Sequence, residues 1–89
     1  MMDEARQAII HETFRVLIDD AERGLIEAEV EHKLAMAREI DPDDPEDAAF
    51  VQQERAEWAA QVYAYRRIVD ALIMAELIAL REEPSRCAA

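Results

Sequence analysis

Apolar side chains recur along two long stretches of the chain at intervals typical of one face of a helix. In the first stretch, about residues 3–40, the intervals are mostly three, four and seven, and the positions are Ile10, Phe14, Leu17, Ala21, Leu25 and Ala28, with Ile18 beside them. In the second stretch, about residues 45–83, steps of four and three alternate along Val51, Arg55, Trp58, Val62, Tyr65, Val69, Leu72, Glu76 and Ala79. These intervals predict two helices, each with one packing seam.

The segment between the two stretches, DPDDPED at residues 41–47, predicts a break in the helical backbone. Pro42 disfavours the helical conformation for Asp41, which precedes it. Asp44 followed by Pro45 is typical of a helix N-cap and the first helical residue after it. We therefore expect the second helix to begin at Pro45.

The chain is expected to be one all-α domain over residues 1–89, folded as an antiparallel two-helix hairpin. A short connection makes consecutive helices antiparallel neighbours. Pro84 should end the second helix near residue 83, because proline disfavours helical conformation in the residue before it, and a short tail should follow at 84–89.

Each helix carries more apolar side chains than one seam can bury. Those that lie off the two seams are Ile9, Val16, Ile26, Val30, Tyr63, Met74, Leu77 and Ile78. Exposing that much apolar surface is unusual for a soluble monomer, so we expect the hairpin to dimerise into a four-helix bundle. The residues expected to carry self-association are Phe14, Leu17, Leu25, Trp58, Val62, Tyr65, Val69 and Leu72.

Composition and charge narrow the classes of function. The formal net charge of −11 argues against nucleic acid and anionic membranes as partners, and the most apolar run, residues 68–80, is too short to cross a bilayer. Cys87 is the only cysteine, so no internal disulfide forms, and we expect a cytoplasmic protein. The sequence has no Gly-rich phosphate loop and few hydroxyl side chains, so neither nucleotide binding nor nucleophilic catalysis is indicated.

A hairpin that turns near residues 43–44 pairs positions of the two helices. This register places Gly24, the only glycine, opposite Tyr63, where it would make room for the ring. It also places His11 opposite Glu76, which interrupts the most apolar part of the second helix. We expect these two side chains to form a buried polar contact that fixes the register of the helices.

Glu29 and His32 have the Glu-x-x-His spacing that di-iron helical bundles use to bind metal. The same register places Glu54 opposite His32, so a two-fold dimer would bring together four carboxylates and two imidazoles. At these residues the chain resembles the half-ferritins, which dimerise to complete a ferritin-like centre. That resemblance implies bound iron or manganese and an oxidase or iron-handling role. The half-ferritins carry Glu-x-x-His on the second helix, whereas this chain carries it on the first.

The competing interpretation of these residues is structural. Asp and Glu make up 21 of the 89 residues, so a glutamate three positions before a histidine is expected often by chance. His32 is then a partly buried side chain that bonds to a neighbouring carboxylate, such as Glu31 or Glu54.

The acids of the loop form a candidate docking tip for a partner protein with a basic surface. They are Asp41, Asp43, Asp44, Glu46 and Asp47. The sequence favours a non-enzymatic, homodimeric protein-interaction module, such as an adaptor, an assembly factor or a small inhibitor. The alternatives are the ferritin-like di-iron or di-manganese protein and a structural subunit of a larger ring or shell.

Overall fold

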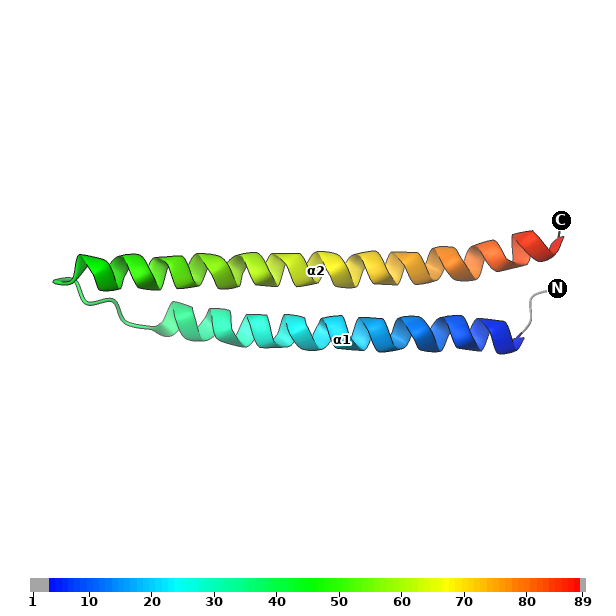
Figure 1. Cartoon of the computed structure of the whole chain (residues 1–89), viewed down its shortest axis with the longest axis horizontal. Coiled ribbons are helices and arrows are strands. Elements are labelled where there is room, and N and C mark those ends of the chain that lie inside the picture. The colour runs from blue at the N-terminus through cyan, green and yellow to red at the C-terminus, as the bar shows by residue number, and fades with distance from the viewer. Residues whose placement is uncertain (1–3, 89) are drawn as a thin grey trace.

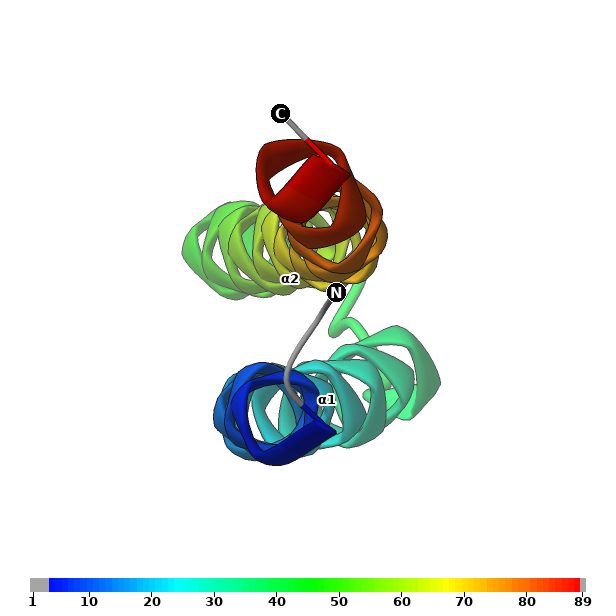
Figure 2. The ribbon, with the colours of Figure 1, turned by 90° about the vertical axis from the view of Figure 1, so that its right-hand side faces the viewer.

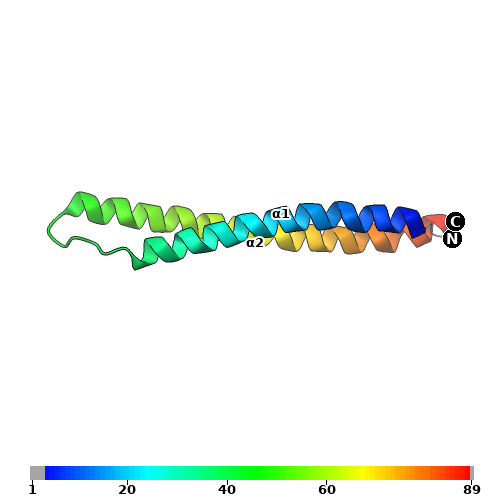
Figure 3. The same cartoon turned by 90° about the horizontal axis from the view of Figure 1, so that it is seen from below.

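The computed structural model describes the backbone of residues 4–88 and the side chains of residues 4–81. Two helices, α1 (Glu4–Ala37) and α2 (Pro45–Ala88), run antiparallel and form a rod of 70 × 18 × 12 Å (Figure 1). Between residues 4 and 88 there is no strand. The described residues thus confirm the predicted all-α, two-helix hairpin. Seen along the rod and from below, the helices cross at a shallow angle (Figures 2 and 3).

The start of α2 is fixed by an aspartate cap, as predicted. The Asp44 carboxylate accepts hydrogen bonds from the backbone N–H groups of Glu46 and Asp47, at 3.0 and 3.2 Å. These N–H groups lie in the first turn of the helix, where no backbone carbonyl is available to them. Pro45 occupies the first helical position, where its missing N–H costs nothing.

The first helix ends at Ala37, three residues earlier than the sequence indicated. Arg55 of α2 explains how it can end there. Its guanidinium donates to the carbonyl oxygens of Ala35, Met36 and Arg38, at 3.0, 3.2 and 3.0 Å. The last carbonyls of a helix lack partners within the helix, so an arginine that binds them stabilises this end.

The second helix continues through Pro84 to Ala88, beyond the end predicted near residue 83. A proline in a helix removes one backbone hydrogen bond and crowds the carbonyl four residues earlier, which bends a helix as often as it stops one. Figure 1 shows α2 curving away from α1 towards its last turns. Residues 84–88 of the expected tail are therefore helical in their backbone, while the side chain of Cys87 lies outside the described residues.

The seam between the helices is close to the predicted one. All nine seam positions of α2 are buried or half-buried, and Val51 is fully enclosed. In α1 the prediction differs at one step, because Ile18 is buried at 4% exposure whereas Leu17 is 47% exposed. Ile18 follows Phe14 by four residues and precedes Leu25 by seven, so it continues the alternation of four and three. Leu17 lies about 100° further round the helix.

Small residues of α1 face large residues of α2 along this seam. Ala21, Ala28 and Ala35 are buried on α1. The prediction placed Gly24 opposite Tyr63, but in the structure Gly24 faces Tyr65. A Cβ added at Gly24 would lie 2.7 Å from Cζ of Tyr65 and 3.0 Å from its Cδ1. The glycine therefore makes room for a ring, as expected, but for the one two residues further along, and α1 is continuous across it.

Within the residues that the structure describes, neither helix has the length of apolar sequence that a membrane crossing requires.

Candidate functional site

Large apolar side chains are exposed on both helices. The buried core of the hairpin is small and consists of Ile18, Ala21, Ala28, Ala35, Val51, Val62 and Val69. The exposed large apolar residues are Ile9, Val16, Leu17, Ile26, Val30, Leu34, Met36, Phe50, Tyr63, Ile68, Ile73, Met74, Leu77 and Ile78. All eight residues that were predicted to lie off the seams are among them. The chain alone leaves most of its large aliphatic surface in water.

The predicted self-association residues occupy three kinds of position. Leu17 is exposed. Val62 and Val69 are each 9% exposed and lie in the seam, where they pack against α1 of the same chain. The other five, which are half-buried at the edges of the seam, are Phe14, Leu25, Trp58, Tyr65 and Leu72.

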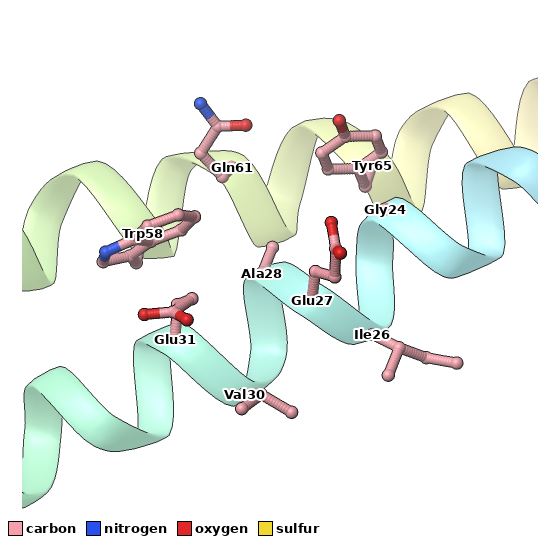
Figure 4. Close-up of a pocket in the computed structure, with 9 residues that line it drawn as sticks. All are labelled: Gly24, Ile26, Glu27, Ala28, Val30, Glu31, Trp58, Gln61 and Tyr65. Carbon is pink, nitrogen blue, oxygen red and sulfur yellow. The ribbon is translucent and has the colours of Figure 1, made fainter.

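One side of the hairpin is hollowed along the line where the helices meet. A hollow of about 740 Å³ is lined by Gly24, Glu27, Glu31, Trp58 and Tyr65, among others (Figure 4). In Figure 4 the ring of Trp58 lies between the helices above Glu31, and the Glu27 carboxylate of α1 points towards α2.

A second hollow of about 500 Å³ adjoins the first and shares Gly24, Glu27 and Tyr65 with it. Its remaining lining includes the apolar side chains of Leu17, Ile68 and Leu72. We call the side that carries both hollows the grooved face. We call the half nearer the loop, with Glu27 and Glu31, its acidic half. The half nearer the chain ends, where Leu17, Ile68 and Leu72 lie beside Asp20 and Arg23, is its apolar half.

On the opposite side of the hairpin, the face of α1 is charged. Arg66 of α2 lies 3.8 Å from the Glu29 carboxylate of α1, and Arg15 lies 3.9 Å from Asp19. Glu12 and Glu22 share this side of α1 by their helical spacing, since they lie three residues from Arg15 and Asp19 respectively. Self-association through this face of α1 would have to dehydrate these charges.

His11 and Glu76 lie in contact as predicted, but His11 is exposed, so the contact is not the buried one that was expected. His11 Nδ1 lies 3.2 Å from Glu76 Oε2, with side chains 58% and 15% exposed. The geometry is not that of a hydrogen bond, so Oε2 is enclosed without an aligned donor among the described residues. A carboxylate oxygen in this position destabilises the hairpin.

The metal hypothesis required Glu29, His32 and Glu54 to lie together, and the structure separates them. Glu54 binds Arg38 at 2.9 Å, and Glu29 faces Arg66. In the described part of the chain, no three His, Cys, Asp or Glu side chains gather in a way that could hold a metal ion.

The loop acids divide into two groups. Asp41, Asp44 and Asp47 accept hydrogen bonds from backbone N–H groups of the loop and of the first turn of α2. Asp43 and Glu46 are exposed, and their carboxylates accept no hydrogen bond from a described residue. The docking tip predicted from five acids therefore offers two carboxylates that have no structural role.

Sequence reasoning missed the clasp that Arg55 forms on the end of α1. An arginine at a seam position, 20 residues after Ala35, was the available signal.

This chain was compared with protein-family models, with curated proteins and with solved structures, and none of the three comparisons found a match.

Proposed function

We propose that this protein is a non-enzymatic interaction module that works as a homodimer. The observation that carries the proposal is the exposed apolar surface, which exceeds the buried core in both number and size of side chains. A two-helix hairpin with so small a core gains much of its stability from covering that surface with protein. A second hairpin would complete a four-helix bundle.

Several of its polar side chains are engaged in holding the hairpin together, which supports a non-catalytic role. Arg55 binds carbonyl groups, Asp44 caps α2, and Glu29 and Glu54 face arginines. The acidic half of the grooved face and the free carboxylates of the loop suit a basic partner protein. We place the module in the cytoplasm, where a lone cysteine such as Cys87 stays reduced.

Sedimentation velocity and light scattering over the micromolar range test self-association. The proposal expects twice the chain mass, with dissociation on dilution, because the covered apolar surface is the source of affinity. A folded species that keeps the mass of one chain throughout this range would overturn it.

The loop is tested separately with poly-L-lysine as a defined basic probe at low salt. The double variant Asp43→Asn/Glu46→Gln should bind several-fold more weakly, because these two carboxylates are free to form ion pairs. The matched control is Glu12→Gln/Asp70→Asn, which removes two exposed acids away from the loop. Equal weakening in the control would show that only net charge matters, and the docking role of the loop would then be wrong.

A further inference from the structure

We infer that a second copy of this chain binds the apolar half of the grooved face, in the opposite direction, so that the two acidic loops lie at opposite ends of the dimer. The inference rests on the proposed self-association and adds the surface and orientation of the contact. The surface is defined by Leu17, Ile68 and Leu72, which line the second hollow, with Ile10 seven residues before Leu17 on the same face of α1.

The two faces of α1 differ in what they offer to a partner. On the grooved face, at intervals of seven, α1 presents Ile10, Leu17 and Gly24. On the opposite face it presents charged side chains, including the Arg15–Asp19 pair. Burying the grooved face removes apolar surface from water, whereas burying the other dehydrates charges. The grooved face is therefore the one that a second copy covers.

Charge along the rod selects the orientation. Glu27 and Glu31 line the hollow nearer the loop, and the five loop acids lie beyond them. Two copies stacked in the same direction would bring the acids of one copy close to those of the other, where they repel each other. Two antiparallel copies that overlapped completely would press the acids onto apolar side chains. Only antiparallel copies offset along the rod place apolar half against apolar half and keep both acidic halves in water.

The expected contact is small but sufficient for a dimer. Residues 64–80 of α2 span about 25 Å of helix, and two such helix pairs bury roughly 600 Å² per copy, the low end for specific complexes. We therefore expect dissociation in the micromolar range. The acidic half of the grooved face stays uncovered in this arrangement and remains open to the basic partner.

Three matched charge substitutions test the surface. Ile68→Glu introduces a carboxylate into the apolar half of the grooved face. Ile73→Glu makes the same change five residues along α2 at similar exposure, 42% against 46%, on the other side of the helix. Leu34→Glu lies on the grooved face but in the half nearer the loop, at 61% exposure.

The mass of each variant is measured by sedimentation at a concentration where the wild type is dimeric. The inference expects Ile68→Glu to be monomeric, with affinity reduced at least tenfold, and the other two to remain dimers. Loss of the dimer in Ile73→Glu, or its retention in Ile68→Glu, would place the contact on another face. Loss in Leu34→Glu would show complete overlap. A monomeric wild type would overturn the proposed function as well. Circular dichroism checks that each variant stays helical.

Orientation is tested with spin labels on the loop. Asp43→Cys in a Cys87→Ser background puts one label on each loop, at an exposed side chain that makes no hydrogen bond with a described residue. In the inferred dimer the labels are further apart than the 70 Å length of one hairpin, beyond strong dipolar coupling. Strong coupling in a sample of dimer mass would show loops at the same end. That result would overturn the inferred orientation and leave the homodimer intact.

Discussion

Gly24 is a residue at which helix preference and packing oppose each other. Glycine in a helix interior is about 1 kcal/mol less favourable than alanine. The space that a methyl group would need is occupied by the ring of Tyr65, whose Cζ would lie 2.7 Å from the added carbon. The tight approach of ring to backbone explains why the only glycine of the chain lies within a long helix.

We predict that Gly24→Ala lowers the free energy of unfolding by about 1–2 kcal/mol, because the ring must move and helix preference offsets only part of that cost. In a Tyr65→Ala background the same substitution should raise the free energy of unfolding by about 1 kcal/mol. Chemical denaturation of the four proteins of this cycle measures both effects. An equal effect of Gly24→Ala in the two backgrounds would contradict the assigned contact.

Glu76 is a carboxylate in the most apolar part of α2, with one oxygen enclosed and unbonded. We predict that Glu76→Leu raises the free energy of unfolding by about 1–3 kcal/mol, since an enclosed carboxylate oxygen that makes no aligned hydrogen bond is replaced by an apolar group. If this residue also fixes register, the variant should associate into species of mixed mass. Thermal unfolding and sedimentation measure the two effects, with Glu76→Gln as control. If Glu76→Leu were less stable than the wild type, the contact between His11 and Glu76 would stabilise the fold more than the distance between them implies.

For single residues, the sequence predicted burial correctly where the apolar periodicity was strict. The alternation of four and three fixed every seam position of α2, and the His11–Glu76 contact followed from the register. Leu17 and Ile18 were harder to separate, because both are apolar neighbours and only the continuation of the seam through Leu25 decides between them. For the metal trio, the structure shows that Glu29 and Glu54 each face an arginine.

The end of α1 shows how one element is completed by another. Arg55 lies in the α2 seam, and its side chain crosses to the three carbonyls where α1 stops. A helix end that is bonded in this way does not need a glycine. The sequence predicted both helices and the start of α2, because capping is local. It did not predict the end of α1, because that depends on a residue about 20 positions away.

We predict that Arg55→Ala lowers the free energy of unfolding by about 2–3 kcal/mol, since hydrogen bonds from a charged donor to three carbonyls are lost. Arg55→Lys should recover less than half, because an ammonium group lacks the fork that reaches all three. Amide hydrogen exchange should quicken at residues 35–40. The control is Arg67→Ala, whose guanidinium binds only the exposed Tyr63 hydroxyl among described residues. A comparable loss in Arg67→Ala would contradict the special role of Arg55.

Across the whole molecule, charge and apolar surface are distributed unevenly. The loop end is acidic, and the end where α1 begins is apolar on several sides. Because the chain carries a net charge of −11, two copies repel each other before their apolar surfaces meet. The sequence predicted this surplus of apolar surface, but the hollows could be located only from the side chains in place, since they depend on which small and large residues meet.

We predict that the dimer tightens as salt is raised. The screening length falls from about 10 Å at 0.1 M to about 3 Å at 1 M salt, which weakens repulsion between copies and leaves apolar burial in place. Sedimentation equilibrium over this range should give a falling dissociation constant, while Ile68→Glu stays monomeric. A dimer that weakens with salt would show that ion pairs hold the copies together.

The hairpin is tied at one end only. Arg55 and Asp44 fasten the loop to both helices, whereas at the other end α2 curves away from the first turn of α1 (Figure 1). Thermal opening should therefore begin at the unlinked end, where the helices separate first, and spread towards the loop. A bound second copy would act there as a clamp. Dilution, which dissociates the dimer, should then speed deuterium uptake in the early turns of α1. Uptake around residues 35–47 should stay constant. Local opening of the helix ends would then report on assembly.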